Sequence, residues 1–158
     1  MKLVSLTIAV ALAGGAAMAA EVGPREVAFN EDGAVEVSLS GMAGDPASGA
    51  EIMAAKSRGN CVACHEITAL SDTPFHGEVG PMLDGAGDRW TAAELRSILV
   101  NSKVMFEDTV MPAYYVIDGF NRPGDAYTGK AAQGDLDPLL AAQEIEDVIA
   151  FLMTLKDE

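Results

Sequence analysis

The hydrophobic positions of the chain repeat at helical spacing in three stretches, at about residues 46–58, 91–101 and 141–156. The first stretch opens with a capping aspartate followed by a proline and ends at a glycine, an order typical of a complete helix. The second opens with a capping box, in which a threonine is followed three positions later by a glutamate. The apolar residues of the three stripes are Ala50, Met53, Leu95, Ile98, Leu99, Ile145, Val148, Ile149, Phe151, Leu152 and Leu155.

Residues 21–44 follow a different pattern. Within residues 35–39 apolar and polar side chains alternate, which predicts a short strand, and residues 27–29 are its expected partner across a turn at Asp32-Gly33. So small a hairpin has no core of its own. We therefore expect a short β-like N-terminal arm that packs on the rest of the domain or on a partner protein.

Two long stretches between the helices are rich in proline and glycine. Residues 67–88 and 104–140 are predicted to be mostly loop. Long loops without structure argue against a compact domain unless they surround something functional. The pattern therefore predicts an all-α domain of three helices whose loops enclose a bound group.

The first twenty of the 158 residues have the layout of a secretory signal. Lys2 precedes an apolar run that is too short to span a bilayer, and a small-residue stretch then places cleavage after Ala19 or Ala20. We thus expect a signal peptide at residues 1–20, the arm at 21–44 and a single domain at 45–158. The mature protein is expected in the periplasm.

The chain is strongly acidic. It has 24 Asp and Glu residues against 10 Lys and Arg, for a formal net charge of −14. No basic patch is present, so nucleic acid and membrane surfaces are not expected partners. We interpret the acidic side chains as solvated faces of helices rather than as catalytic carboxylates.

The two cysteines of the sequence, Cys61 and Cys64, stand directly before His65. A Cys-x-x-Cys-His run is the attachment signature of c-type haem. Both thiols can reach the two vinyl groups of one porphyrin, and one helical turn places the imidazole on the same face for the iron. The sequence therefore predicts one covalent haem c, with His65 as an axial ligand of the iron.

Three other interpretations of these cysteines are weaker. A zinc site needs four ligands, and beyond this run the sequence offers only His76. A thioredoxin-like motif follows a strand in an alternating pattern of strands and helices, which the chain lacks. A structural disulfide is the simplest alternative in an exported protein.

A second axial ligand must come from elsewhere in the chain. Met111 is the strongest candidate, because Pro112 holds it in an extended conformation and 46 residues separate it from His65, enough to reach the opposite face of a haem. Met105 is the second choice. The other candidates are expected to be core residues or solvated loop residues, namely Met42, Met53, Met82, Met153 and His76.

Taken together, these features resemble the class I c-type cytochromes. The resemblance rests on the haem motif, on Gly80-Pro81-Met82-Leu83, on Met111-Pro112 and on the final helix. It implies that the carbonyl of Pro81 accepts a hydrogen bond from the second ring nitrogen of His65, which fixes the imidazole. It also supports Met111 as the ligand.

Within that family the chain resembles the SoxX-type subunits of SoxAX complexes. The residues concerned are the runs 57–60, 80–83, 89–90, 109–115 and 143–148. The resemblance implies an electron-transfer subunit that forms a heterodimer with a SoxA-type haem subunit. That complex oxidatively conjugates thiosulfate to a cysteine of the SoxYZ carrier protein and passes the electrons to a small soluble cytochrome c. The chain itself would be the non-catalytic subunit of this L-cysteine S-thiosulfotransferase.

Other positions are more open. Arg89 and Trp90 are candidate donors to a haem propionate, or else a surface residue and a helix staple. Tyr114 and Tyr115 are expected in packing or at a partner surface. A freestanding periplasmic electron carrier remains the alternative function, since the haem chemistry is common to both.

Overall fold

The computed structural model describes residues 20–124 and 128–157, so the predicted signal segment lies almost wholly outside the described residues. The described residues contain no β-sheet, only one isolated bridge between Gly124 and Ala131. The elements in chain order are α1 (Pro46–Ala54), η1 (Cys61–Ala63), η2 (Thr68–Leu70), α2 (Ala86–Arg89), α3 (Ala92–Met105) and α4 (Ala142–Leu152), where η marks a 3₁₀ turn. The predicted all-α class is thereby confirmed.

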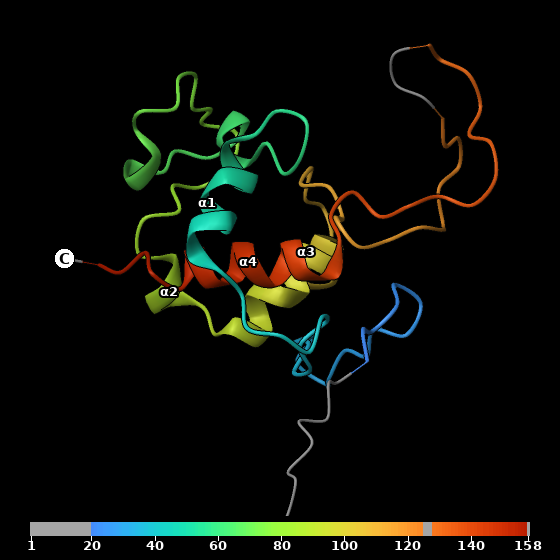
Figure 1. Cartoon of the computed structure of the whole chain (residues 1–158), viewed down its shortest axis with the longest axis horizontal. Helices are drawn as coiled ribbons and strands as arrows, with labels where there is room; N and C mark the ends of the chain where they lie inside the picture. Colours follow the sequence, from blue (N-terminus) through green and yellow to red (C-terminus); the bar gives the residue numbers. More distant parts are fainter. Residues whose placement is uncertain (1–19, 125–127, 158) are drawn as a thin grey trace, which may run out of the picture.

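The helices α1 and α4 cross in close contact at the centre of the molecule (Figure 1). Two glycines make this approach possible. A Cβ atom added at Gly44 would overlap the carbonyl oxygen of Glu146, and one added at Gly49 would overlap that of Asp147. The start of the domain is therefore packed directly on the backbone of its last helix.

The helix starts agree with the sequence prediction. The Asp45 side chain accepts a hydrogen bond from the backbone N–H of Ala47, with Pro46 in the first turn. Thr91 and Glu94 form the predicted capping box of α3. The helices α1 and α4 end two to four residues earlier than predicted, at Ala54 and Leu152. The side chains of these three helices build one hydrophobic core.

Helix α3 is broken at Asn101, whose backbone angles are φ −152° and ψ 93°. This is where the sequence predicts the helix to end. One further turn follows the break and reaches Met105. The broken helix thus brings Ser102 and Lys103 to a position that a straight helix would not give them.

The predicted strand in the arm is wrong. Residues 35–39 form no strand, and Val37 is 66% exposed whereas Val35 and Leu39 are buried in the common core. The backbone here bonds to a buried ion pair instead of to a neighbouring strand. The arm does pack on the domain, as the sequence led us to expect.

That ion pair joins α3 to α4. The Arg96 guanidinium donates from Nε and Nη2 to the Glu146 carboxylate, at 2.8 and 2.9 Å. Its Nη1 donates to the carbonyl of Val35 at 2.7 Å, and Glu146 accepts from the N–H of Leu39 at 2.8 Å. Glu146 and Asp147 are buried, so the interpretation of the acidic residues as solvated is wrong for these two.

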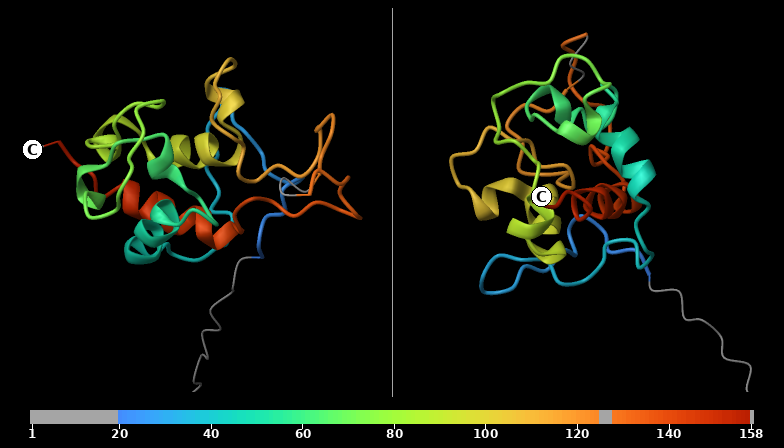
Figure 2. Two further views of the ribbon diagram at one scale, coloured as in Figure 1. Left: turned by 90° about the horizontal axis from the view of Figure 1, so that it is seen from above. Right: turned by 90° about the vertical axis from the view of Figure 1, so that its left-hand side faces the viewer.

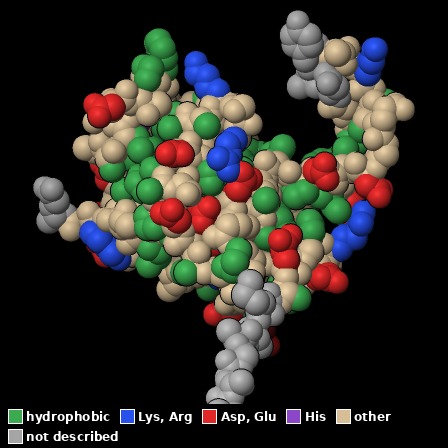
Figure 3. All heavy atoms as spheres, viewed as in Figure 1, with side chains coloured by type: hydrophobic (Ala, Val, Ile, Leu, Met, Phe, Trp, Pro, Cys, Tyr) green, Lys and Arg blue, Asp and Glu red, His purple; other side chains and the backbone are tan. Residues whose placement is uncertain are grey.

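The long loop, residues 116–139, extends away from the helical body in both Figure 1 and the left view of Figure 2. Residues 125–127 of this loop are not described, and none of its described residues is buried. No helix within residues 20–124 and 128–157 is long and apolar enough to cross a membrane. Figure 3 shows acidic side chains scattered over the visible face.

Candidate functional site

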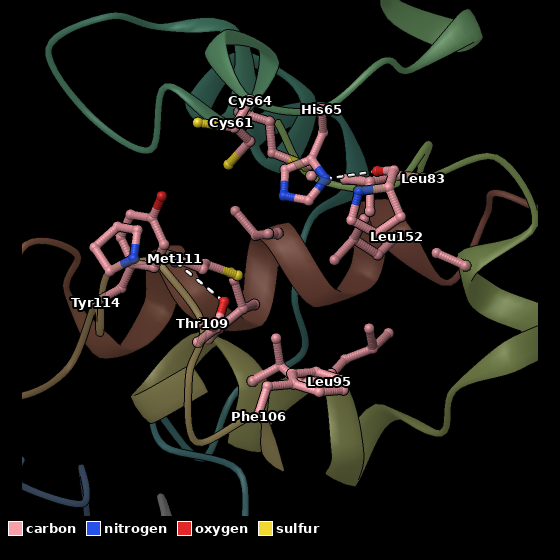
Figure 4. A pocket seen from close by; sticks show the side chains of 18 of the residues that line it. Cys61, Cys64, His65, Leu83, Leu95, Phe106, Thr109, Met111, Tyr114 and Leu152 are labelled. Carbon is pink, nitrogen blue, oxygen red and sulfur yellow. Dashed lines mark hydrogen bonds between the residues drawn. The ribbon is translucent and has the colours of Figure 1, made fainter. Parts of the chain in front are cut away.

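A cavity of about 490 Å³ lies between α1, α3, α4 and the connecting loops. Its lining is mostly apolar, and includes side chains from all three main helices, among them Met53, Leu95 and Leu152. Figure 4 shows two thiols and an imidazole on one side and a thioether on the other. The predicted residues Cys61, Cys64, His65 and Met111 are therefore brought together around one space, although Met111 lies far from the others in the sequence.

The turn η1 presents the cysteines to this cavity. It begins after Asn60, which has a left-handed backbone conformation with φ 49°, a conformation that asparagine tolerates better than most residues. The N–H groups of Cys64 and His65 both donate to the carbonyl of Cys61, at 3.1 and 3.0 Å. This single turn places both thiols and the imidazole on the cavity wall, as the motif predicts.

Both thiols are free, so the structure holds no disulfide between them. Burial raises the pKa of the Cys61 thiol to about 12, although a hydrogen bond with Tyr114 acts in the opposite direction. Because this pKa lies well above neutrality, Cys61 is protonated in the folded chain and is a poor nucleophile. The environment does not favour thioredoxin-like exchange.

A zinc site fits no better. Among the residues that the structure describes, no group of three or more His, Cys, Asp or Glu side chains could hold a metal ion. His76 lies outside the cavity lining, in the loop after η2. Its Nδ1 accepts from the N–H of Ile67 at 3.2 Å, and its Nε2 lies 3.1 Å from the carbonyl of Leu70. His76 is thus half-buried and fixes its own loop, rather than being solvated as expected.

The imidazole of His65 has a defined orientation. Its Nδ1 lies 2.6 Å from the carbonyl oxygen of Pro81, so Nδ1 carries the proton and donates it. The lone pair of Nε2 is then available on the other side of the ring, which points into the cavity in Figure 4. Gly80 is required here, because a Cβ atom at this position would overlap the ring. This is the contact that the family resemblance implied for Pro81.

Met111 reaches the cavity from the loop after α3. Its sulfur lies across the space from the cysteines and His65 (Figure 4). Its backbone N–H donates to the Thr109 hydroxyl at 3.2 Å, and its carbonyl accepts from Ser102 Oγ at 2.8 Å. Both peptide groups of Met111 are therefore fixed, and the side chain is the part that enters the cavity.

The competing methionines are placed differently. The Met105 sulfur is directed at the arm, where it would lie 3.3 Å from a Cβ atom at Gly33, and Met105 is absent from the cavity lining. Met42 and Met82 are 49% and 47% exposed. Met53 is buried and lines the cavity from α1, which agrees with its prediction as a core residue.

Arg89 and Trp90 are separated by the structure. Arg89 donates to the carbonyls of Asp84 and Met82, at 2.6 and 3.1 Å, and does not line the cavity. Trp90 does line it, and its ring packs edge-on against Phe106 with centroids 5.9 Å apart. Only Trp90 is thus placed to touch a group held in this space.

Two residues hold the loop that contains Met111: Tyr114, which the sequence predicts in packing or at a partner surface, and Ser102, which the sequence analysis did not single out. Tyr114 is buried and donates from its hydroxyl to the carbonyl of Gly59 at 3.0 Å, which links this loop to the cysteine turn. Ser102 is fully buried. The sequence signal for Ser102 is its position, since it is a polar residue directly after the predicted end of the helix.

The residues fit a haem c by their chemistry. The cavity is apolar, as a porphyrin requires, and it offers thiols for the vinyl groups together with an oriented imidazole and a thioether on opposite sides. These are the donors that a c-type cytochrome uses. No other group with this donor set is expected from the sequence.

Comparison with known proteins agrees with this chemistry. A family model described as cytochrome c matches residues 46–156. The chain is also similar to a chain in a structure described as "Crystal structure of SoxXA from P. pantotrophus", at 56% identity and a TM-score of 0.83, covering 87% of this chain and 99% of that one. The comparison with curated proteins found no match. The predicted resemblance to SoxX is thereby confirmed, and the chain belongs to the cytochrome c family, with a covalent haem c as its cofactor.

Proposed function

We propose that this chain is the electron-transfer monohaem subunit of a periplasmic SoxAX-type complex. The observation that carries the proposal is the 56% identity to a SoxXA chain over 99% of that chain's length. A likeness over so much of the sequence extends well beyond the haem-binding motif. The obligate partner would be a SoxA-type haem subunit.

The placement of the site residues around the cavity supports the following roles. Cys61 and Cys64 would form the thioether bonds, His65 would bind the iron through Nε2, and Met111 would supply the second axial ligand. Haem in this setting supplies a one-electron iron couple whose potential is raised by the thioether. The hydrogen bond from His65 to Pro81 keeps Nε2 unprotonated and aimed at the iron position.

Further side chains shape the surroundings of the haem. The Trp90 indole is our candidate donor to a propionate, because it lies on the cavity wall. Arg89 instead holds the loop that contains Pro81, through the carbonyls of Met82 and Asp84. Arg89 therefore supports the orientation of His65 indirectly, through the backbone of this loop.

The chemistry on the partner would be a two-electron oxidation. A carrier thiol and thiosulfate would form one S–S bond there, releasing one proton and two electrons, which this subunit would accept one at a time. If His65 and Met111 both bind the iron, substrate would have no open coordination site on it. The acidic surface favours a small soluble cytochrome with a basic face as the next acceptor.

The test is to purify the tagged chain from the periplasm of thiosulfate-grown cells. We expect a larger haem protein to co-purify, and the denatured chain to retain one haem by mass, without residues 1–19 or 1–20. A monomer that reduces several oxidases and binds no partner would instead identify a freestanding electron carrier. A mass equal to the bare polypeptide would contradict covalent haem.

Matched variants test the ligands separately. His65→Ala should abolish the low-spin haem spectrum, whereas His76→Ala should leave it intact. Met111→Ala should open the sixth position and lower the potential, whereas Met105→Ala should change neither. If Met105→Ala and Met111→Ala exchange these behaviours, Met105 is the ligand.

A further inference from the structure

The carbonyl oxygen of Met111 accepts two hydrogen bonds from the turn that follows the break in α3. Ser102 Oγ donates at 2.8 Å, and Lys103 Nζ donates to the same oxygen. Ser102 is fully buried, whereas Lys103 is exposed. Two neighbouring side chains thus donate hydrogen bonds to the same peptide group, in the loop that contains Met111.

The break at Asn101 makes this arrangement possible. In a continuous helix the carbonyls of Leu99 and Val100 would accept from residues 103 and 104. Here they accept from the N–H groups of Tyr114 and Tyr115, at 3.0 and 3.2 Å.

The turn after the break has its own cap. The Asn101 side chain accepts from the N–H of Lys103 at 3.2 Å, as an N-cap residue does. Asn101 therefore ends one helical segment and starts another. The carbonyls freed by the break bind the chain just beyond Met111, and the new turn binds Met111 itself.

We propose that Ser102 is a positioning residue for the sixth haem ligand, which rests on the proposed role of Met111. A thioether is a weak, neutral ligand that competes with water and other small bases for the iron. The Met111 thioether therefore stays on the iron only if the backbone of its loop is already fixed in the ligating position. The Ser102 hydroxyl, with Lys103 beside it, supplies that restraint from within α3.

A buried serine in the same helix gives a matched control. Ser97 is as fully buried as Ser102, and its hydroxyl donates to the carbonyl of Gly33 in the arm at 2.5 Å. Ser97→Ala and Ser102→Ala remove the same atom from equally buried positions. Only the second removes a restraint on Met111.

The experiment is a titration of the purified ferric holoprotein with imidazole, followed by the loss of the charge-transfer band of the thioether-ligated haem. Ser102→Ala should raise the apparent affinity for imidazole about fivefold, the factor expected from one lost hydrogen bond. Ser97→Ala should leave it within about twofold while lowering the melting temperature to a similar extent. Equal increases in both variants, or no increase in either, would overturn the proposal.

Two further variants keep the test decisive if Ser102→Ala does not fold. Lys103→Met removes the exposed donor to the same carbonyl and should raise imidazole affinity, whereas Lys103→Arg should not. Met111→Ala must lose the charge-transfer band altogether. If Met111→Ala keeps the band, the ligand assignment is wrong. If Met111→Ala loses the band but Lys103→Met and Ser102→Ala bind imidazole with the affinity of wild type, only the positioning role is wrong.

Discussion

The N-terminal arm, residues 21–44, and the long loop, residues 116–139, both lie outside the three helices that enclose the haem cavity, yet the domain holds them very differently. The arm contributes Val35 and Leu39 to the core and bonds to the buried pair of Arg96 and Glu146. The described residues of the long loop are all at least partly exposed, and the N–H of Ala132 donates to the carbonyl of Pro123 within the same loop.

This difference indicates that the two segments outside the helices have different roles. The arm completes the fold, because its backbone supplies hydrogen bonds that the ion pair needs in an apolar setting. The long loop adds little to the core and leaves its apolar residues Phe120 and Leu139 at 49% and 60% exposure. We therefore propose the long loop, rather than the arm, as the part that contacts the SoxA-type partner.

Deleting residues 21–44 should have the largest effect on stability. We expect a loss of more than about 5 kcal/mol, because Val35 and Leu39 each contribute roughly 2–3 kcal/mol of burial and several hydrogen bonds to α3 are lost as well. Shortening residues 121–137 should change stability by less than about 1 kcal/mol and abolish the complex. Denaturant unfolding and co-purification measure the two outcomes; equal destabilisation by both deletions would refute the contrast.

The ion pair should account for much of the arm's attachment. Glu146→Gln is expected to cost about 4 kcal/mol, because Arg96 would keep its charge in a buried site with a neutral partner. Replacing Arg96 and Glu146 together by Met and Leu should recover part of that loss. The haem spectrum at low temperature serves as the control, since neither residue lines the cavity.

Two leucines provide a matched comparison of single side chains. Leu39→Ala in the arm should cost about 3 kcal/mol, because Leu39 is completely buried. Leu139→Ala in the long loop should change stability by less than about 0.5 kcal/mol and weaken binding to the partner instead. Urea unfolding of the isolated chain, followed by titration with the partner, separates these effects. A stable Leu39→Ala variant would show that the arm is not part of the core.

The smallest effect is expected where the two regions meet. Arg25 of the arm and Asp118 of the loop form an ion pair at 2.9 Å, with side chains that are 65% and 61% exposed. Arg25→Ala should therefore cost less than about 0.5 kcal/mol, and the difference should vanish at high salt. A larger cost would indicate that the arm also holds the long loop in place.

The sequence predicted the helices and the haem motif well because their signals are local. Asp45-Pro46, the capping box at Thr91 and the run from Cys61 to His65 each act within a single turn. Met111 stands out as a candidate ligand because Pro112 restricts the backbone of its neighbour. These are short-range effects that a linear sequence displays directly.

The arm was misinterpreted because its partners are distant in the sequence. Apolar and polar side chains alternate from Val35 to Leu39. This pattern is equally compatible with a strand and with an irregular segment whose backbone bonds to a buried ion pair. What decides between them is Glu146, more than 100 residues away, and its burial beside Arg96. The hold of Ser102 on Met111 was hidden for a similar reason, since it depends on the backbone angles at Asn101.

The close contact of Gly44 and Gly49 with α4 has a consequence for the order of maturation. Helix α4 docks against α1 across almost 90 residues of intervening chain, which include Cys61, Cys64 and His65. Because Val148 and Leu152 of α4 line the cavity, the haem site is complete only after α4 has docked against α1.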